Sequence, residues 1–258
     1  MIKPRLLFGV CATALALAAW TAPAMADPTA GPPICSGPTT PIAGKYRNLE
    51  IKGNRYVASG TTLRVRGNLI LARGACLDAF TLGTVKVGGN IFVKKGAILA
   101  LGCTPQSLEA PGPPCNGQTT DDSVAGSILA YHPLTLYLDG DTIWGNVISI
   151  GGGPGPVLSP YVNFPIKDNV VHGNVFVTGW AGAWFGFIRN VAYGNVVLTD
   201  NVGVTIGALG TQDSTEVATN TIAGNLICLT NKPPAQIGDS GGSPNTVGGR
   251  KIGQCAGL

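Results

Sequence analysis

The sequence predicts an all-β protein that folds as a parallel β-helix, a β-solenoid of about eight coils with capped ends. The first observation is a Gly-Asn pair between apolar residues that recurs along the chain. The second is the alternation of apolar residues after each pair, and the third is a composition of 38 glycines and 12% charged residues without a long amphipathic helical pattern. The copies read VRGNLIL from Val65, VGGNIFV from Val87, IWGNVIS from Ile143, VHGNVFV from Val171, AYGNVVL from Ala192 and IAGNLIC from Ile222, with a degenerate VAGSILA from Val124.

The spacing of these copies indicates one coil per repeat, because their glycines recur every 19 to 37 residues. Leucine-rich and tandem helical repeats of similar period require helical segments and a leucine pattern that are missing here. Each Gly-Asn pair is expected to form a corner, since glycine tolerates left-handed backbone and asparagine hydrogen-bonds neighbouring main chain. Stacked corners would align the asparagines and let their amides bond to one another.

The residues after each corner predict a strand with two apolar faces. Those two and four places after the glycine should point into the core, and the residue between them should point outward. These outward residues are all apolar and form a predicted interaction ridge: Ile70, Phe92, Leu129, Ile148, Phe176, Val197 and Ile227. Either the chain's own N-terminal segment or inserted loop covers the ridge, or the ridge mediates self-association or docking to a surface protein.

The domain organisation follows from the two ends of the chain. Lys3 and Arg5, an apolar run and then Ala24-Met25-Ala26 are typical of a secretory signal peptide over residues 1–26. We expect a secreted, extracellular β-helix domain over residues 27–258 that does not span a membrane once the signal is removed. Within it, residues 27–60 are the predicted N-terminal cap region, 101–123 an inserted loop and 230–258 the C-terminal cap region.

The cysteines predict disulfide bonds and no metal or cofactor site. Of seven cysteines, Cys11 lies in the signal peptide, and an even number in an exported chain indicates three bonds. The short paired spacings and histidines of a zinc site are missing. Joining nearest partners gives the pairs Cys35–Cys76, Cys103–Cys115 and Cys228–Cys255.

The net charge and the positions of the acidic residues bear on two function classes, nucleic-acid binding and catalysis. Removing Lys3 and Arg5 leaves 15 basic against 13 acidic residues, a net charge of +2, and no basic cluster is visible along the sequence, which argues against a nucleic-acid partner. No catalytic constellation is legible. An enzyme would require the dispersed acids to meet in one groove: Asp121, Asp122, Asp139, Asp141 and Asp168.

Aromatic residues crowd into one segment, GWAGAWFGFIRN, which contains Trp180, Trp184, Phe185 and Phe187. Aromatic rings either pack a core or stack on sugars. The second alternative predicts a glycan contact formed by Trp180, Trp184 and Arg189.

Three segments carry a resemblance: NKPPAQIGDSGGSPNTVGGRKIGQC, GNVFVTGWAGAWFGFIRNVAYGNVVL and EVATNTIAGNLICL. They resemble a family of uncharacterised secreted actinobacterial proteins, which implies export and repetitive β structure but no activity. We therefore expect an exported structural or interaction protein at the cell surface or in the extracellular matrix, without catalysis. Its expected partners are a cell-envelope glycan or a surface protein. The alternatives are a polysaccharide-binding protein and a polysaccharide lyase or hydrolase.

Overall fold

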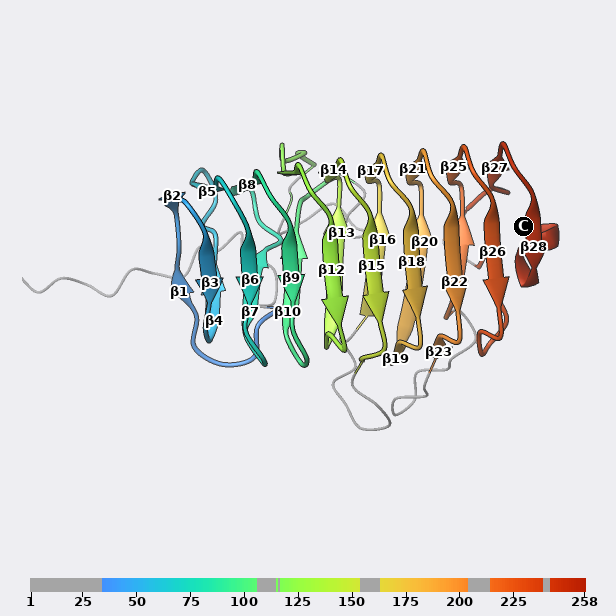
Figure 1. Cartoon of the computed structure of the whole chain (residues 1–258), viewed down its shortest axis with the longest axis horizontal. Coiled ribbons are helices and arrows are strands. Elements are labelled where there is room, and N and C mark those ends of the chain that lie inside the picture. The colour runs from blue at the N-terminus through green and yellow to red at the C-terminus, as the bar shows by residue number, and fades with distance from the viewer. Residues whose placement is uncertain (1–33, 106–114, 116, 154–162, 204–213, 239–241) are drawn as a thin grey trace, which may run out of the picture.

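Three parallel sheets wind around one axis in the computed structural model, which describes residues 34–105, 115, 117–153, 163–203, 214–238 and 242–258 (Figure 1). Within these residues the sheets hold 8, 9 and 9 strands, and neighbouring strands pair in parallel. Each coil supplies one strand to each sheet in turn. The prediction of a parallel β-helix of about eight coils is thereby confirmed.

The strands have the following bounds. Sheet A contains β1 (Thr40–Pro41), β4 (Asn54–Tyr56), β7 (Cys76–Ala79), β10 (Ile98–Leu101), β13 (Thr135–Asp139), β16 (Asn163–Lys167), β20 (Trp184–Ile188) and β24 (Glu216–Ala218). Sheet B contains β2 (Gly44–Tyr46), β5 (Thr62–Val65), β8 (Thr84–Val87), β11 (Ser123–Val124), β14 (Thr142–Ile143), β17 (Val170–Val171), β21 (Val191–Ala192), β25 (Thr221–Ile222) and β27 (Thr246–Val247). Sheet C contains β3 (Leu49–Ile51), β6 (Leu69–Leu71), β9 (Ile91–Val93), β12 (Ile128–Tyr131), β15 (Val147–Ile150), β18 (Val175–Thr178), β22 (Val196–Thr199), β26 (Leu226–Leu229) and β28 (Lys251–Gly253). A short fourth sheet pairs β19 (Ala181–Gly182) with β23 (Val202–Gly203).

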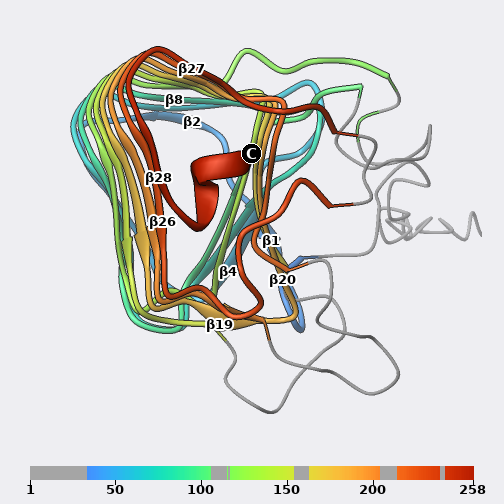
Figure 2. The ribbon, with the colours of Figure 1, turned by 90° about the vertical axis from the view of Figure 1, so that its right-hand side faces the viewer.

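The core fills the space enclosed by the three sheets, seen end-on in Figure 2. Leu69 and Leu71 in β6, like Val175 and Val177 in β18, are fully buried, as the alternation in sequence predicts. Stacked aliphatic side chains thus form one continuous hydrophobic cluster along the axis.

The Gly-Asn corners form a ladder along the axis, but the reason for their glycines differs from the one expected. The glycine of each Gly-Asn pair, or of Gly-Ser in the degenerate copy, is called its marker glycine, and none of these has the left-handed backbone that was predicted: Gly67, Gly89, Gly126, Gly145, Gly173, Gly194 and Gly224. Instead, a Cβ on Gly173 would lie 2.5 Å from both Asn146 Oδ1 and the Gly145 carbonyl oxygen of the coil before it. Glycine is required because consecutive corners stack too closely for any side chain.

The asparagines of these corners bond as predicted from coil to coil. Asn146 Oδ1 accepts the backbone N–H of Asn174 at 2.7 Å, and Asn174 Oδ1 accepts that of Asn195 at 2.8 Å. The asparagine amide groups also donate along the same column, at 3.3 and 3.2 Å. In the degenerate copy, the hydroxyl of Ser127 accepts the backbone N–H of Asn146 instead.

A second, buried ladder follows the ends of the sheet A strands, where the chain turns toward sheet B. The side chain of Asn169 accepts from Asp141 N–H at 2.9 Å and donates to the Leu138 carbonyl at 2.9 Å. Asn190, Asn220 and Asn245 repeat this arrangement in later coils. The residue before Asn169 and Asn190 has a left-handed φ of 58° and 56°, at Asp168 and Arg189.

Covalent and capping features hold the two ends. The three disulfides are Cys35–Cys76, Cys103–Cys115 and Cys228–Cys255, so the predicted pairing is confirmed. The 3-10 helix η1 (Gln254–Gly257) lies over the C-terminal end of the core, with Cys255 buried (Figure 2). The described part of the predicted N-terminal cap region contains β1 to β4. The predicted signal peptide and the start of that cap region lie outside the described residues, as do residues 106–114 and 116 of the inserted loop.

Candidate functional site

The predicted glycan contact does not form around Trp180. This side chain is 0% exposed; its Nε1–H donates to the Leu134 carbonyl at 3.1 Å, and its ring packs 5.2 Å from that of Phe164. Gly182 leaves room for the indole, since a Cβ there would lie 2.0 Å from the ring. The prediction that Trp180 contacts a glycan is therefore wrong. The aromatic segment mainly fills the core, where Phe185 and Phe187 are buried as well.

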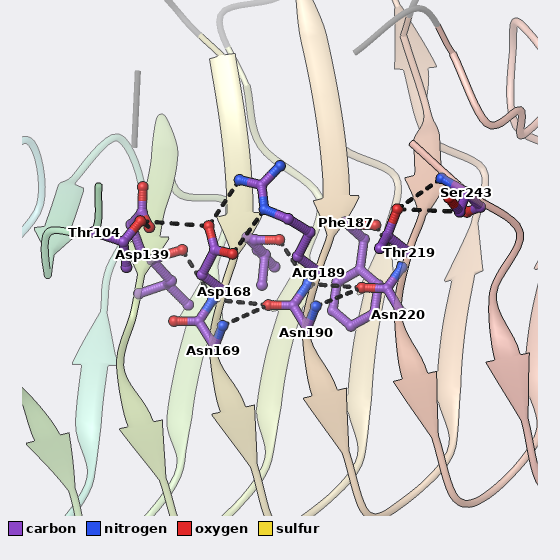
Figure 3. A network of polar contacts seen from close by, with 12 residues as sticks. Thr104, Asp139, Asp168, Asn169, Phe187, Arg189, Asn190, Thr219, Asn220 and Ser243 are labelled. Atoms are coloured by element: carbon purple, nitrogen blue, oxygen red, sulfur yellow. Dashed lines mark hydrogen bonds and ion pairs between the residues drawn. The ribbon is translucent and has the colours of Figure 1, made fainter. Parts of the chain in front are cut away.

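The other two residues of that prediction are partly exposed but lie apart. Trp184 begins β20, and the Lys167 ammonium lies 4.9 Å from the centre of its ring. Arg189 follows the last residue of β20 and forms a bidentate ion pair with Asp168, at 2.7 and 2.8 Å (Figure 3). The length of one strand, roughly 16 Å, separates Trp184 from Arg189. These two residues do not make a single contact surface.

The dispersed acids do come together, but inside the protein. Asp122, Asp139 and Asp141 are at most 2% exposed, at the turn between sheets A and B. Thr104 donates to Asp139 at 2.8 Å and lies 3.4 Å from Asp168, which joins the group from the next coil (Figure 3). Asp121 is separate, with 85% of its side chain exposed and an ion pair to Lys86 at 2.5 Å. Because glycoside hydrolysis requires carboxyl groups facing a substrate, this buried arrangement does not favour an enzyme.

Burial makes two of these acids weak. Loss of solvation raises the pKa of Asp122 to about 6, although the backbone N–H of Val85 and the Thr120 hydroxyl oppose the shift. Burial raises the pKa of Asp141 well above its ordinary value, and the nearby carboxylates of Asp122 and Asp139 raise it further. Within the described residues, neither side-chain oxygen of Asp141 has a well-aligned hydrogen-bond partner. These shifts therefore reflect a structural position in the interior.

An aromatic column that was not predicted lies at the corner between sheets B and C. It contains the residue before the marker glycine in three consecutive coils: Trp144, His172 and Tyr193. The Trp144 and His172 rings stack with centroids 4.0 Å apart and planes 7° apart, and His172 and Tyr193 stack at 5.0 Å and 13°. Trp144 is 57% exposed and Tyr193 is 56% exposed. A row of large aromatic side chains exposed to solvent is a candidate interaction surface.

An open groove lies at the N-terminal end of this column. In the two preceding coils the same position is held by Ala125 and Gly88, so no described aromatic ring stacks on the face of Trp144 turned away from His172. The groove has a volume of about 350 Å³ and is lined by Arg64, Val65, Arg66, Lys86, Val87, Gly88, Ser123, Ala125 and Trp144. A second hollow of about 210 Å³ adjoins it at Arg66 and is lined by Lys45, Tyr46, Arg47 and Arg66.

The walls of these hollows are basic, and the prediction that the chain has no basic cluster is wrong. Register places Lys45, Arg64 and Lys86 side by side on β2, β5 and β8. Arg47 and Arg66 form the adjacent column at the corner. Within each column about one coil of sequence separates one basic residue from the next, so the columns form only after folding. Comparing the residue before each marker glycine would have revealed the corner columns.

The predicted ridge has the expected geometry. Parallel register aligns its residues along the outer face of sheet C, and every one of them is partly exposed: Ile70, Phe92, Leu129, Ile148, Phe176, Val197 and Ile227. Ile252 in β28 extends the ridge by one coil, and Glu50 precedes it. No described segment runs over this face (Figure 2). What the ridge contacts stays a prediction.

No helix in the described ranges is long and apolar enough to cross a bilayer. The same residues contain no group of three or more His, Cys, Asp or Glu side chains suited to a metal ion. No family model, curated protein or solved structure matches this chain.

Proposed function

We propose that this protein is an exported, non-catalytic binding protein that holds a polysaccharide against the outer face of sheet B. The observation that carries the proposal is the uncovered face of Trp144 at the end of an open groove. The C–H groups of a pyranose ring pack well on an indole face, and an exposed aromatic ring loses little entropy on binding. Export is supported by the three disulfides and by the predicted signal peptide.

The repeat of the fold favours a linear ligand. Consecutive coils rise by about 4.8 Å, which is close to the length of one sugar residue in an extended chain. Hydroxyl groups continue along the sheet B face from the groove, at Ser123 in its lining and at Thr142 in the next coil. A polysaccharide lying along the axis would therefore meet the outward residue of each coil in turn, which is basic up to Lys86, bears a hydroxyl at Ser123 and Thr142, and is aliphatic at Val170.

The fluorescence of Trp144 tests this proposal. Binding of a panel of soluble polysaccharides to the oxidised protein should shift the emission of the exposed indole, and Trp144→Ala should remove both the shift and the binding. Tyr193→Ala is the matched control, because it removes a ring of similar exposure from the other end of the column and leaves the Trp144 face intact. If Trp144→Ala binds the panel as well as the unchanged protein, sheet B does not bind polysaccharide.

A second candidate function, self-association, is favoured by the ridge on sheet C. Its outward apolar side chains continue without a polar interruption from Ile70 to Ile252. We propose a second copy of this chain as its occupant, since only another stack of the same coils repeats side chains at the same spacing along the whole ridge. Both functions can operate together because the two faces belong to different sheets.

A further inference from the structure

The groove beside Trp144 differs from a neutral sugar site in the number of cations around it. Arg64, Arg66 and Lys86 line the groove, while Lys45 and Arg47 line the hollow that continues it. Lys86 is the one of these five cations that has a carboxylate within ion-pair distance among the described residues. Like charges placed this close repel one another unless an anion lies between them.

These cations lie along the path of a polysaccharide that starts at the Trp144 ring and runs toward the N-terminal end of the protein. Three coil steps separate the column position of Arg66 from that of Trp144, or about 14 Å along the axis. The small residues Gly88 and Ala125 occupy the two intervening positions, so no large side chain fills the groove there. A sugar stacked on Trp144 would therefore be followed by residues whose substituents lie between the two basic columns.

One described acid forms an ion pair with a cation of the groove, and this pair shows how a ligand carboxylate can be received. Lys86 forms an ion pair with Asp121, whose side chain is 85% exposed. A surface pair of this kind contributes little stability, and an incoming anion can replace Asp121 at small cost. Asp121 thus occupies the place that a carboxylate of the ligand would take.

From this arrangement we propose that the groove binds an acidic polysaccharide, a polymer of uronic acid residues, with one sugar stacked on Trp144 and its carboxylates held by Arg64, Arg66 and Lys86. This proposal rests on the proposed polysaccharide-binding function and names the ligand class. Single-stranded nucleic acid fits less well, because it requires several free aromatic faces along its path and this groove offers one. Past Lys86 the same column of sheet B continues with the neutral Ser123 and Thr142, which suit sugar hydroxyls better than phosphates.

Paired ligands that differ only in charge test the proposal. Calorimetry should detect binding of an oligogalacturonate to the disulfide-bonded protein, and its methyl ester, which lacks the charges, should bind roughly tenfold more weakly or worse. Joint substitution of Arg64→Gln and Arg66→Gln should abolish that difference. Asp121→Asn should strengthen oligogalacturonate binding by freeing Lys86. Added salt should weaken the acidic ligand more than the ester.

Matched controls separate this inference from general electrostatics and from the proposed function. Arg73→Gln with Lys95→Gln removes the same charge at exposed positions beyond the end of sheet C and should leave the preference intact. Equal binding of acid and ester, or equal effects of the two charge pairs, would overturn the acidic ligand while leaving Trp144-dependent polysaccharide binding in place. Tighter binding of a single-stranded oligonucleotide than of the oligogalacturonate would overturn both.

Discussion

Two aspartates hold positions that asparagines hold in the following coils. Asp122 and Asp141 precede Asn169, Asn190 and Asn220 in one column, as the backbone bonds from Thr142 to Asp122 and from Val170 to Asp141 show. An asparagine there accepts one backbone N–H and donates to one carbonyl. A carboxylate can accept but cannot donate, so Asp141 leaves the ladder incomplete.

We expect Asp141→Asn to stabilise the protein by roughly 1–3 kcal/mol at pH 7, because it supplies the missing donor and removes a buried acid. The pKa of Asp122 rises from 3.8 to about 6 and that of Asp141 rises well above 3.8, so the folded state binds more protons than the unfolded state above pH 4. Stability should therefore fall as the pH rises from about 4 through 6 and beyond, and the substitution should flatten this slope. Urea unfolding across that range measures both effects; an unchanged slope would contradict the assignment.

The buried asparagine ladder and the ladder at the Gly-Asn corners are expected to contribute different amounts of stability to the strands they join. Asn190 is buried and its side chain takes part in bonds to Asn169, Ile166 and Asn220. Asn174 is exposed at the Gly-Asn corner, where water can replace its bonds. Asparagine is therefore expected to stabilise the fold more in the buried column than in the exposed one.

Asn190→Ala should cost about 3 kcal/mol or more, because it leaves the Ile166 carbonyl and the Asn169 N–H without partners in the interior. Asn174→Ala, its matched control on the surface ladder, should cost about 1 kcal/mol. Chemical denaturation of the two variants gives the comparison. Equal losses would mean that the buried ladder contributes no more than the exposed one.

At the scale of the whole molecule, the proposed self-association depends on the ridge. Replacing Phe92 and Phe176 by Thr should leave the fold intact, since both side chains point outward and threonine suits a strand. Sedimentation should then show a shift from an associated species to the monomer. Thr178→Ser with Thr199→Ser, on the same face, is the control and should not change association. A loss of thermal stability without any change in association would identify the ridge as internal packing.

The sequence predicts the scaffold well because a solenoid repeats its local rules. The alternation after each glycine is enough to place Leu69 and Leu71 inside and Ile70 outside, and the cysteine pairs follow from neighbouring coils. The basic face of sheet B could not be predicted by reading along the chain, because residues one coil apart, such as Arg64 and Lys86, meet only through register. The sequence left open whether Trp180 packs the core or contacts a glycan, because periodicity does not tell which side of a turn faces the core.

The disulfides at the two ends affect how the rod responds to tension. Coils in a solenoid contact only their neighbours, so a pulled or frayed chain unravels one coil at a time from a terminus. Cys35–Cys76 ties the entering segment to β7, and Cys228–Cys255 ties the last strand region to β26. Both starting points for unravelling are therefore closed by covalent bonds. An oxidised molecule anchored at a mechanically stressed surface can bear load along its axis without losing its terminal coils.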